Sequence, residues 1–176
     1  MLRKILAITA LCLSLPVFAL DAAKEYEIKA AFLFNLGSFI TWPESAFENA
    51  ATPFHICVLG TDPFGEILDV ITTDQTVSGH PVIIRRLHDI TEATHCEVVF
   101  ISQSEQPRIQ AIFDALSSQP VLTVSDMDDF VLRGGMVQFF PLNNKIRLML
   151  APEAFSEAGL KASAHLMRIA QLKKGK

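Results

Sequence analysis

Residues 54–65 have the sequence FHICVLGTDPFG, in which a mostly apolar run meets a turn. The run from Phe54 to Leu59 predicts a buried strand, because a strand covered on both faces is apolar without alternation. Residues 60–63 then predict a strand-to-helix turn, where Thr61 or Asp62 caps a helix that extends to about Ile71. A strand leading directly into a helix is the repeating unit of a parallel α/β fold.

The alternation of strand and helix continues after this unit. Apolar runs predict strands at residues 81–86, 98–102 and 120–124, and a hairpin of residues 136–140 and 145–150 turning at 142–144. Helices are expected at residues 24–40, 105–116 (capped by Ser104), 125–133 (opened by Ser125 or Asp126), 153–158 and 162–172. The predicted fold is therefore α/β, a single three-layer domain with a mostly parallel sheet, helices on both faces and a C-terminal antiparallel hairpin.

The start of the chain is typical of a secretory signal peptide. Arg3 and Lys4 precede an apolar run at residues 5–15, which is shorter than the roughly 20 residues that span a bilayer. Small residues favour cleavage after Ala19, with Ala23 as the alternative site. We expect residues 1–19 to be the signal peptide and residues 20–176 to be the exported α/β domain.

Charge and motifs exclude several functions. Cleavage after Ala19 removes two positive charges, so the formal net charge of −4 becomes −6, and nucleic acid is not an expected partner. Residues 60–65 do not form a phosphate loop, because they lack its Gly-Lys-Ser/Thr ending. Asp126, Asp128 and Asp129 resemble the start of a calcium loop, but the glycine and glutamate that such a loop needs further on are missing. Because no catalytic set is present either, the sequence predicts a protein without enzymatic activity, cofactor or metal.

Two cysteines remain after export, and two interpretations of them are open. An even number in an oxidising compartment indicates a Cys57–Cys96 disulfide. The alternative is a zinc site made by these two thiolates together with His55 and His95.

The ends of the predicted strands suggest where a small ligand could bind. In open α/β sheets, ligands bind beyond the carboxyl ends of the strands. The polar residues expected at that edge are Thr61, Asp62, Ser102, Ser104 and Ser125.

Several short motifs, in this order and spacing, resemble the YfiR/HmsC-like family of exported bacterial proteins. They extend from about residue 24 to residue 172: AAFLFN (30–35), WP (42–43), VLGTDPFG (58–65), GHP (79–81), Cys96 before VVFIS (98–102), VLTVSD (121–126), RGGM (133–136) and AGL (158–160). Cys57 and Cys96 match the paired cysteines of that family. A second disulfide found in some members has no counterpart here, since no cysteine follows Cys96.

This resemblance implies a periplasmic, non-enzymatic repressor. Such a protein binds the outer part of an inner-membrane diguanylate cyclase, holds it inactive, and so lowers cyclic di-GMP and biofilm formation. The alternative function is a ligand-binding sensor subunit for a membrane histidine kinase or cyclase, and a homodimer is also compatible with the sequence.

A repressor with a net charge of −6 is expected to use an apolar patch to contact its partner. The candidates are Phe34 and Phe39 on the first helix and Phe139 and Phe140 on the hairpin. The competing interpretation places these aromatic side chains in the core, above all Phe34 and Phe139.

Overall fold

The computed structural model describes residues 18–49 and 51–173. Its main sheet has the strand order β10-β8-β7-β6-β5-β2-β4-β3. The strands β4, β2, β5, β6 and β7 run parallel, and β8 returns antiparallel to β7, which confirms the predicted fold class. The strand bounds are β2 Phe54–Leu59, β3 Thr76–Val77, β4 His80–Leu87, β5 Val98–Ile101, β6 Leu122–Ser125, β7 Val137–Leu142, β8 Lys145–Leu150 and β10 Gln171–Leu172.

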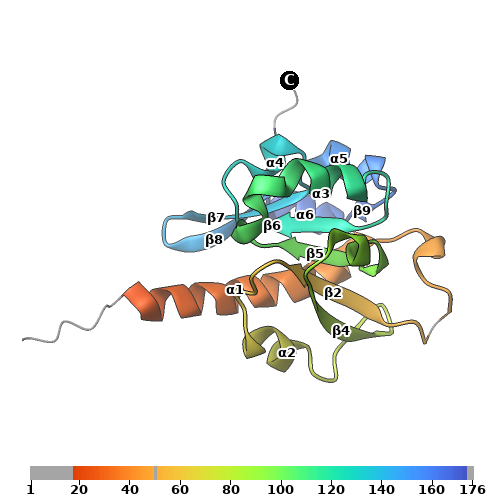
Figure 1. The fold of residues 1–176 in the computed structure, drawn as a ribbon, viewed down its shortest axis with the longest axis horizontal. Helices are drawn as coiled ribbons and strands as arrows, with labels where there is room; N and C mark the ends of the chain where they lie inside the picture. Colours follow the sequence, from red (N-terminus) through yellow and green to blue (C-terminus); the bar gives the residue numbers. More distant parts are fainter. Residues whose placement is uncertain (1–17, 50, 174–176) are drawn as a thin grey trace, which may run out of the picture.

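Helices cover both faces of this sheet (Figure 1). On one face lie α1 (Phe18–Phe39), α2 (Glu66–Thr72) and α6 (Ala164–Ile169), and on the other lie α3 (Ile109–Leu116) and α4 (Phe130–Arg133). The remaining helical segments are η1 Glu44–Ala46, η2 Ile90–His95, η3 Gln103–Arg108 and α5 Pro152–Glu157. A second, two-stranded antiparallel sheet joins β1 (Ile40–Thr41), at the end of α1, to β9 (Lys161–Ala162).

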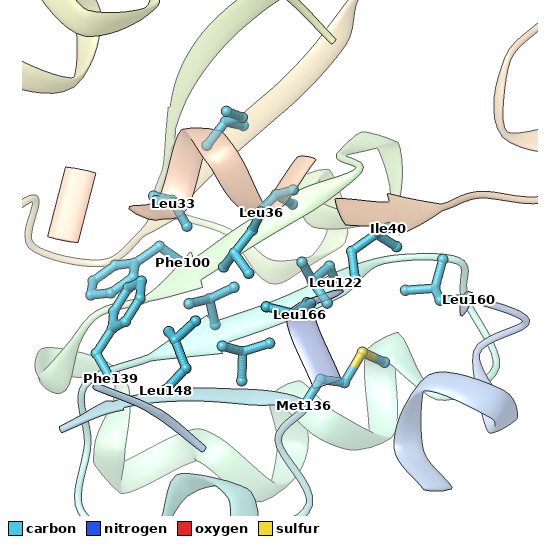
Figure 2. Close-up of a cluster of buried hydrophobic side chains, with 14 of the residues drawn as sticks. Leu33, Leu36, Ile40, Phe100, Leu122, Met136, Phe139, Leu148, Leu160 and Leu166 are labelled. Atoms are coloured by element: carbon cyan, nitrogen blue, oxygen red, sulfur yellow. The ribbon is translucent and has the colours of Figure 1, made fainter. Parts of the chain in front are cut away.

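The central strands divide the core into two layers because successive side chains of a strand point to opposite faces. Val98 and Phe100 face α1, whereas Val99 and Ile101 face α3. Figure 2 shows the first layer, in which Phe100 and Phe139 lie beside Leu33 and Leu36 of α1. Because β5 is buried on both sides, its apolar run carries no alternation.

Several predicted helices begin or end elsewhere. The first, expected at residues 24–40, is α1 and already begins at Phe18. The helix expected after residue 63 begins at Glu66, since Gly65 has a positive φ of 55°. The helix expected from residue 105 is 3-10 helical until Arg108, because Pro107 lacks an N–H and disfavours the α conformation of Gln106. Ser104 does not cap this helix. The helix expected from residue 125 begins only at Phe130, because the preceding Asp129 has a left-handed backbone conformation.

The last predicted helix is divided into three elements. Its first residue, Ala162, pairs with Ile40 of β1, and its last residue, Leu172, pairs with Leu150 of β8. Only α6 between them is helical, with Ser163 accepting a hydrogen bond from the backbone N–H of Leu166 at its start. Backbone pairing with distant strands therefore takes precedence over the helical pattern of the sequence.

The predicted signal peptide lies almost entirely outside the described residues. Residues 1–17 are outside the described part of the chain, and α1 begins at Phe18. Within residues 18–49 and 51–173, no helix combines the length and the apolar character needed to cross a membrane.

Candidate functional site

The polar residues predicted to bind a ligand do lie together at the carboxyl edge of the sheet. From β2 the chain goes first to β4 on one side and then crosses to β5 on the other side of β2. The boundary between β2 and β5 is therefore the switch point of a doubly wound fold. The loop after β2 carries Thr61 and Asp62. Ser102 and Ser104 follow β5 at the start of η3, and Ser125 is the last residue of β6. The structure thus brings the predicted residues to the place where ligands bind in such folds.

Three of the five side chains, those of Asp62, Ser104 and Ser125, are engaged with the protein itself. Ser104 Oγ accepts a hydrogen bond from the Thr61 N–H at 2.9 Å. Buried Ser125 donates to the Ile101 carbonyl at 2.7 Å and accepts from the Met127 N–H at 3.1 Å. A Cβ at Gly60 would lie 2.4 Å from Ser104 Oγ, so the two loops are in close contact. These hydroxyl groups join the loops at the edge of the sheet.

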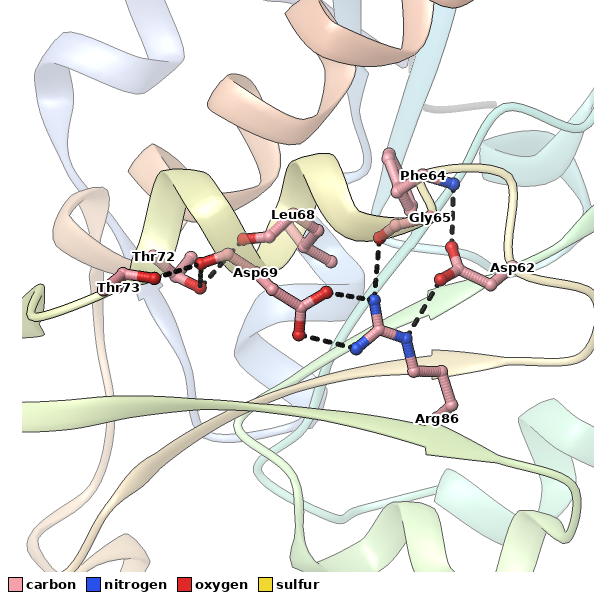
Figure 3. Close-up of polar contacts among 8 residues, drawn as sticks. All are labelled: Asp62, Phe64, Gly65, Leu68, Asp69, Thr72, Thr73 and Arg86. Carbon is pink, nitrogen blue, oxygen red and sulfur yellow. Dashed lines mark hydrogen bonds and ion pairs between the residues drawn. The ribbon is translucent and has the colours of Figure 1, made fainter.

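Asp62 belongs to a clamp centred on Arg86 of β4 (Figure 3). Arg86 Nε donates to Asp62 Oδ2 at 3.0 Å, and its two terminal nitrogens donate to the two oxygens of Asp69 at 2.7 and 2.5 Å. One of these nitrogens also donates to the Gly65 carbonyl at 2.8 Å. Hydrogen bonds from the guanidinium lower the pKa of Asp69, so this carboxylate stays ionised. The clamp fixes the loop after β2 and the start of α2 on an outer strand of the sheet.

A buried ion pair that no local sequence pattern predicted joins α1 to the end of β6. Lys29 Nζ lies 2.6 Å from Asp126 Oδ2, and both side chains are only 5% exposed. Tyr26 donates its hydroxyl to the same carboxylate oxygen at 2.9 Å, and Glu25 contacts Lys29 from the surface at 2.6 Å. Burial and the charge of Asp126 raise the pKa of Tyr26, which therefore remains a hydrogen-bond donor. This cluster ties the first helix to the carboxyl edge of the sheet.

The disulfide between Cys57 and Cys96 is present, with a Cα–Cα distance of 6.1 Å. Both residues are buried beneath α3, with exposures of 0% and 3%. Their sulfur atoms are bonded to each other and cannot serve as thiolate ligands, so the zinc interpretation is wrong. Across the part of the chain that the structure describes, no cluster of His, Cys, Asp and Glu could hold a metal ion.

Thiol titration tests this bridge in solution. Denatured, non-reduced protein cleaved after Ala19 should contain no titratable thiol, because Cys12 leaves with the signal peptide. After reduction the same sample should contain two. Two thiols without reduction would contradict the disulfide.

Glu97 is a buried acidic residue next to the disulfide. Its side chain accepts a hydrogen bond from the backbone N–H of His55 at 2.6 Å, and the residue is 8% exposed. Burial raises the pKa of Glu97 above its ordinary 4.5, whereas burial lowers the pKa of His55. The protonated form of Glu97 is therefore favoured by folding, and its contribution to stability is lost as the pH rises through the raised pKa.

Replacing Glu97 with Gln should stabilise the protein at alkaline pH. The amide oxygen can still accept from His55, but no charge has to be buried. We expect a higher Tm than wild type at pH 8, by about 2–4 °C for each kcal/mol gained, and an advantage that shrinks as the pH falls toward 4.5. Thermal melts at pH 8, 6 and 4.5 measure this, with exposed Glu48→Gln as the control. A pH-independent difference would show that burial of the charge is not the cause.

The four phenylalanines predicted to contact a partner lie in different environments. Phe139 is 1% exposed and packs between Phe32 and Phe100, so it belongs to the core. Phe34 and Phe39 are half-buried on α1, and Phe39 stacks on His165 of α6 with ring centroids 5.5 Å apart. Phe140 is half-buried on β7. Phe34, Phe39 and Phe140 thus keep part of their surface exposed, whereas Phe139 does not.

Comparison with known proteins assigns the chain to a family. The sequence profile of the family described as YfiR/HmsC-like matches residues 26–171, which include nearly all of the described fold. A search of curated proteins returned no match. Members of the family are periplasmic and regulate cyclic di-GMP signalling rather than catalyse a reaction. Because the match covers most of its length, the chain belongs to the YfiR/HmsC-like family.

Proposed function

We propose that the mature protein represses a membrane-bound diguanylate cyclase by binding its periplasmic domain. The observation that carries this proposal is the family match over residues 26–171. Repression at the membrane would lower cyclic di-GMP and biofilm formation. At the polar edge of the sheet, where an α/β enzyme would bind its substrate, the hydroxyl groups of Ser104 and Ser125 are engaged in contacts within the protein, which agrees with a binding role.

A repressor of this kind acts by unequal affinity. It must bind the inactive conformation of the cyclase more tightly than the active one, because a ligand with equal affinity for two states shifts neither. Half-buried aromatic side chains such as Phe39 and Phe140 offer apolar contact that does not depend on charge. That suits a protein whose net charge is negative.

The test is deletion of the gene in its own bacterium, followed by measurement of cyclic di-GMP and biofilm mass. We expect both to rise, and we expect detergent-solubilised membranes to yield a cyclase that co-purifies with the mature protein. Unchanged levels under several growth conditions, with no cyclase recovered, would contradict the proposal. Recovery of a histidine kinase instead would favour the alternative function of a sensor subunit.

Function in the periplasm requires export, and we propose cleavage of the signal peptide after Ala19. The intact mass of the exported protein measures the cleavage site. A mass corresponding to cleavage after Ala23 would support the alternative site, and a chain that keeps Met1 would contradict the proposal.

A further inference from the structure

We propose that an apolar groove along α1 binds an apolar segment of the membrane partner that is flanked by carboxylates. This inference rests on the proposed function and assigns it a surface. The groove runs between α1 on one side and β8 and α6 on the other. It is made by two neighbouring cavities.

The first cavity, of 440 Å³, lies between the N-terminal half of α1 and the tip of the β7–β8 hairpin. Its apolar residues are Ile28, Pro141 and Ile146. Figure 1 shows the hairpin and this half of α1 extending in the same direction from the body of the protein. The second cavity, of 200 Å³, lies between α1, β8 and α6 and is lined almost entirely by apolar side chains, Phe39 and Ile169 among them.

The two cavities lie end to end. Ile28 lines the first and Phe32 the second, and these residues are one helical turn apart on α1. Ile146 and Leu148, which line them from the sheet, are two residues apart and so share a face of β8. From Lys24 to Phe39 the groove follows α1 for about 22 Å, at roughly 1.5 Å per residue. That length can hold several successive anchoring side chains of a bound segment.

Exposed apolar side chains stand along the groove. Ile28 is 41% exposed and Ile169 is 49% exposed, although both are large and aliphatic. Binding an apolar segment would remove their surface from water, which is the main favourable term in most protein association.

Positive charge at the end of the groove indicates which residues should flank the bound segment of the partner. Lys24 and Lys145 both line the first cavity, and neither forms an ion pair within residues 18–49 and 51–173. The carboxylate of Glu25 in the same cavity is already bound to Lys29. Two lysines on a chain of net negative charge attract carboxylates locally and orient the partner. The two lysines at one end of the groove and the apolar side chains at the other match an apolar segment with flanking carboxylates, as the membrane partner of the proposed function would present, so we commit to that partner rather than to a second copy.

The experiment compares surface variants of the full-length protein in the deletion strain. Ile28→Glu and Ile169→Glu change the groove, and Val70→Glu and Leu132→Glu are matched controls at positions 71% and 60% exposed outside it. The double variant Lys24→Glu/Lys145→Glu is matched by Arg133→Glu/Lys161→Glu. Each is scored for cyclic di-GMP and for the Tm of the purified protein.

We expect the groove variants to lose at least tenfold in repression, with a Tm close to wild type, while the control variants repress normally. A photo-crosslinking residue at position 169, but not at position 132, should join the protein to the membrane cyclase. If deletion raises cyclic di-GMP but the groove variants still repress, the groove inference is overturned and the proposed function stands. If deletion changes nothing, both fail. A crosslinked product of twice the mature mass would assign the groove to a second copy and overturn the inference.

Discussion

Replacing Val99 with Asp should leave no folded protein. Val99 is fully buried in β5, with Cys57 of β2 and Thr123 of β6 as its neighbours across the sheet. An aspartate there would face the apolar layer under α3 without a cationic partner. Burying an unpaired charge costs several kcal/mol or more, which is comparable with the roughly 5–15 kcal/mol that stabilise a typical domain.

Circular dichroism with heating measures the effect. We expect Val99→Asp to be aggregated or to melt without a cooperative transition. The same substitution at Val70, which is 71% exposed on α2, is the control and should change stability by no more than about 0.5 kcal/mol. A normal melting curve for Val99→Asp would mean that β5 is not buried in the sheet.

Breaking the ion pair between Lys29 of α1 and Asp126 at the end of β6 should cause the second large loss of stability. Lys29→Met leaves the Asp126 carboxylate buried with only the Tyr26 hydroxyl as a side-chain partner. Removing one member of a buried pair costs about 3–5 kcal/mol, so we expect the Tm to fall by on the order of 10 °C. Asp126→Asn should cost less, because Lys29 keeps Glu25 at 2.6 Å and that carboxylate is partly solvated.

A double-mutant cycle isolates the pair from the packing around it. Lys29→Met combined with Asp126→Leu removes both charges, and the double variant should be more stable than the sum of the single effects implies. Additive effects would show that the two charges are not coupled. An Asp126→Asn variant less stable than Lys29→Met would contradict the asymmetry expected from Glu25.

The strands and the hairpin could be predicted from the sequence, because they depend on local patterns. The structure has strands near the predicted positions, namely β2, β5, β6 and the hairpin of β7 and β8. Burial on both faces and the type of turn depend on residues that are neighbours in the sequence, so local patterns are enough to predict them. The disulfide also follows from composition, since only two cysteines remain after export.

Features that depend on distant partners were missed. Lys29 and Asp126 are 97 residues apart, and nothing near either residue indicates the other. Asp62 was predicted to cap a helix or line a pocket. It does not cap α2; it binds Arg86, 24 residues later, and accepts a hydrogen bond from the Phe64 N–H at 2.7 Å. Residues 162–172 carry apolar positions that suit a helix, but pairing with β1 and β8 makes both ends extended.

The disulfide has a consequence for survival among the proteases of the cell envelope. It spans 39 positions of sequence that include α2, β3, β4 and η2, and the exposed segment at residues 73–76 lies within that span. A protease that cuts this segment would produce two fragments that remain covalently joined. The six paired positions between β2 and β4 would also keep the fragments in register. A nicked molecule should therefore stay folded and migrate as a single chain until it is reduced.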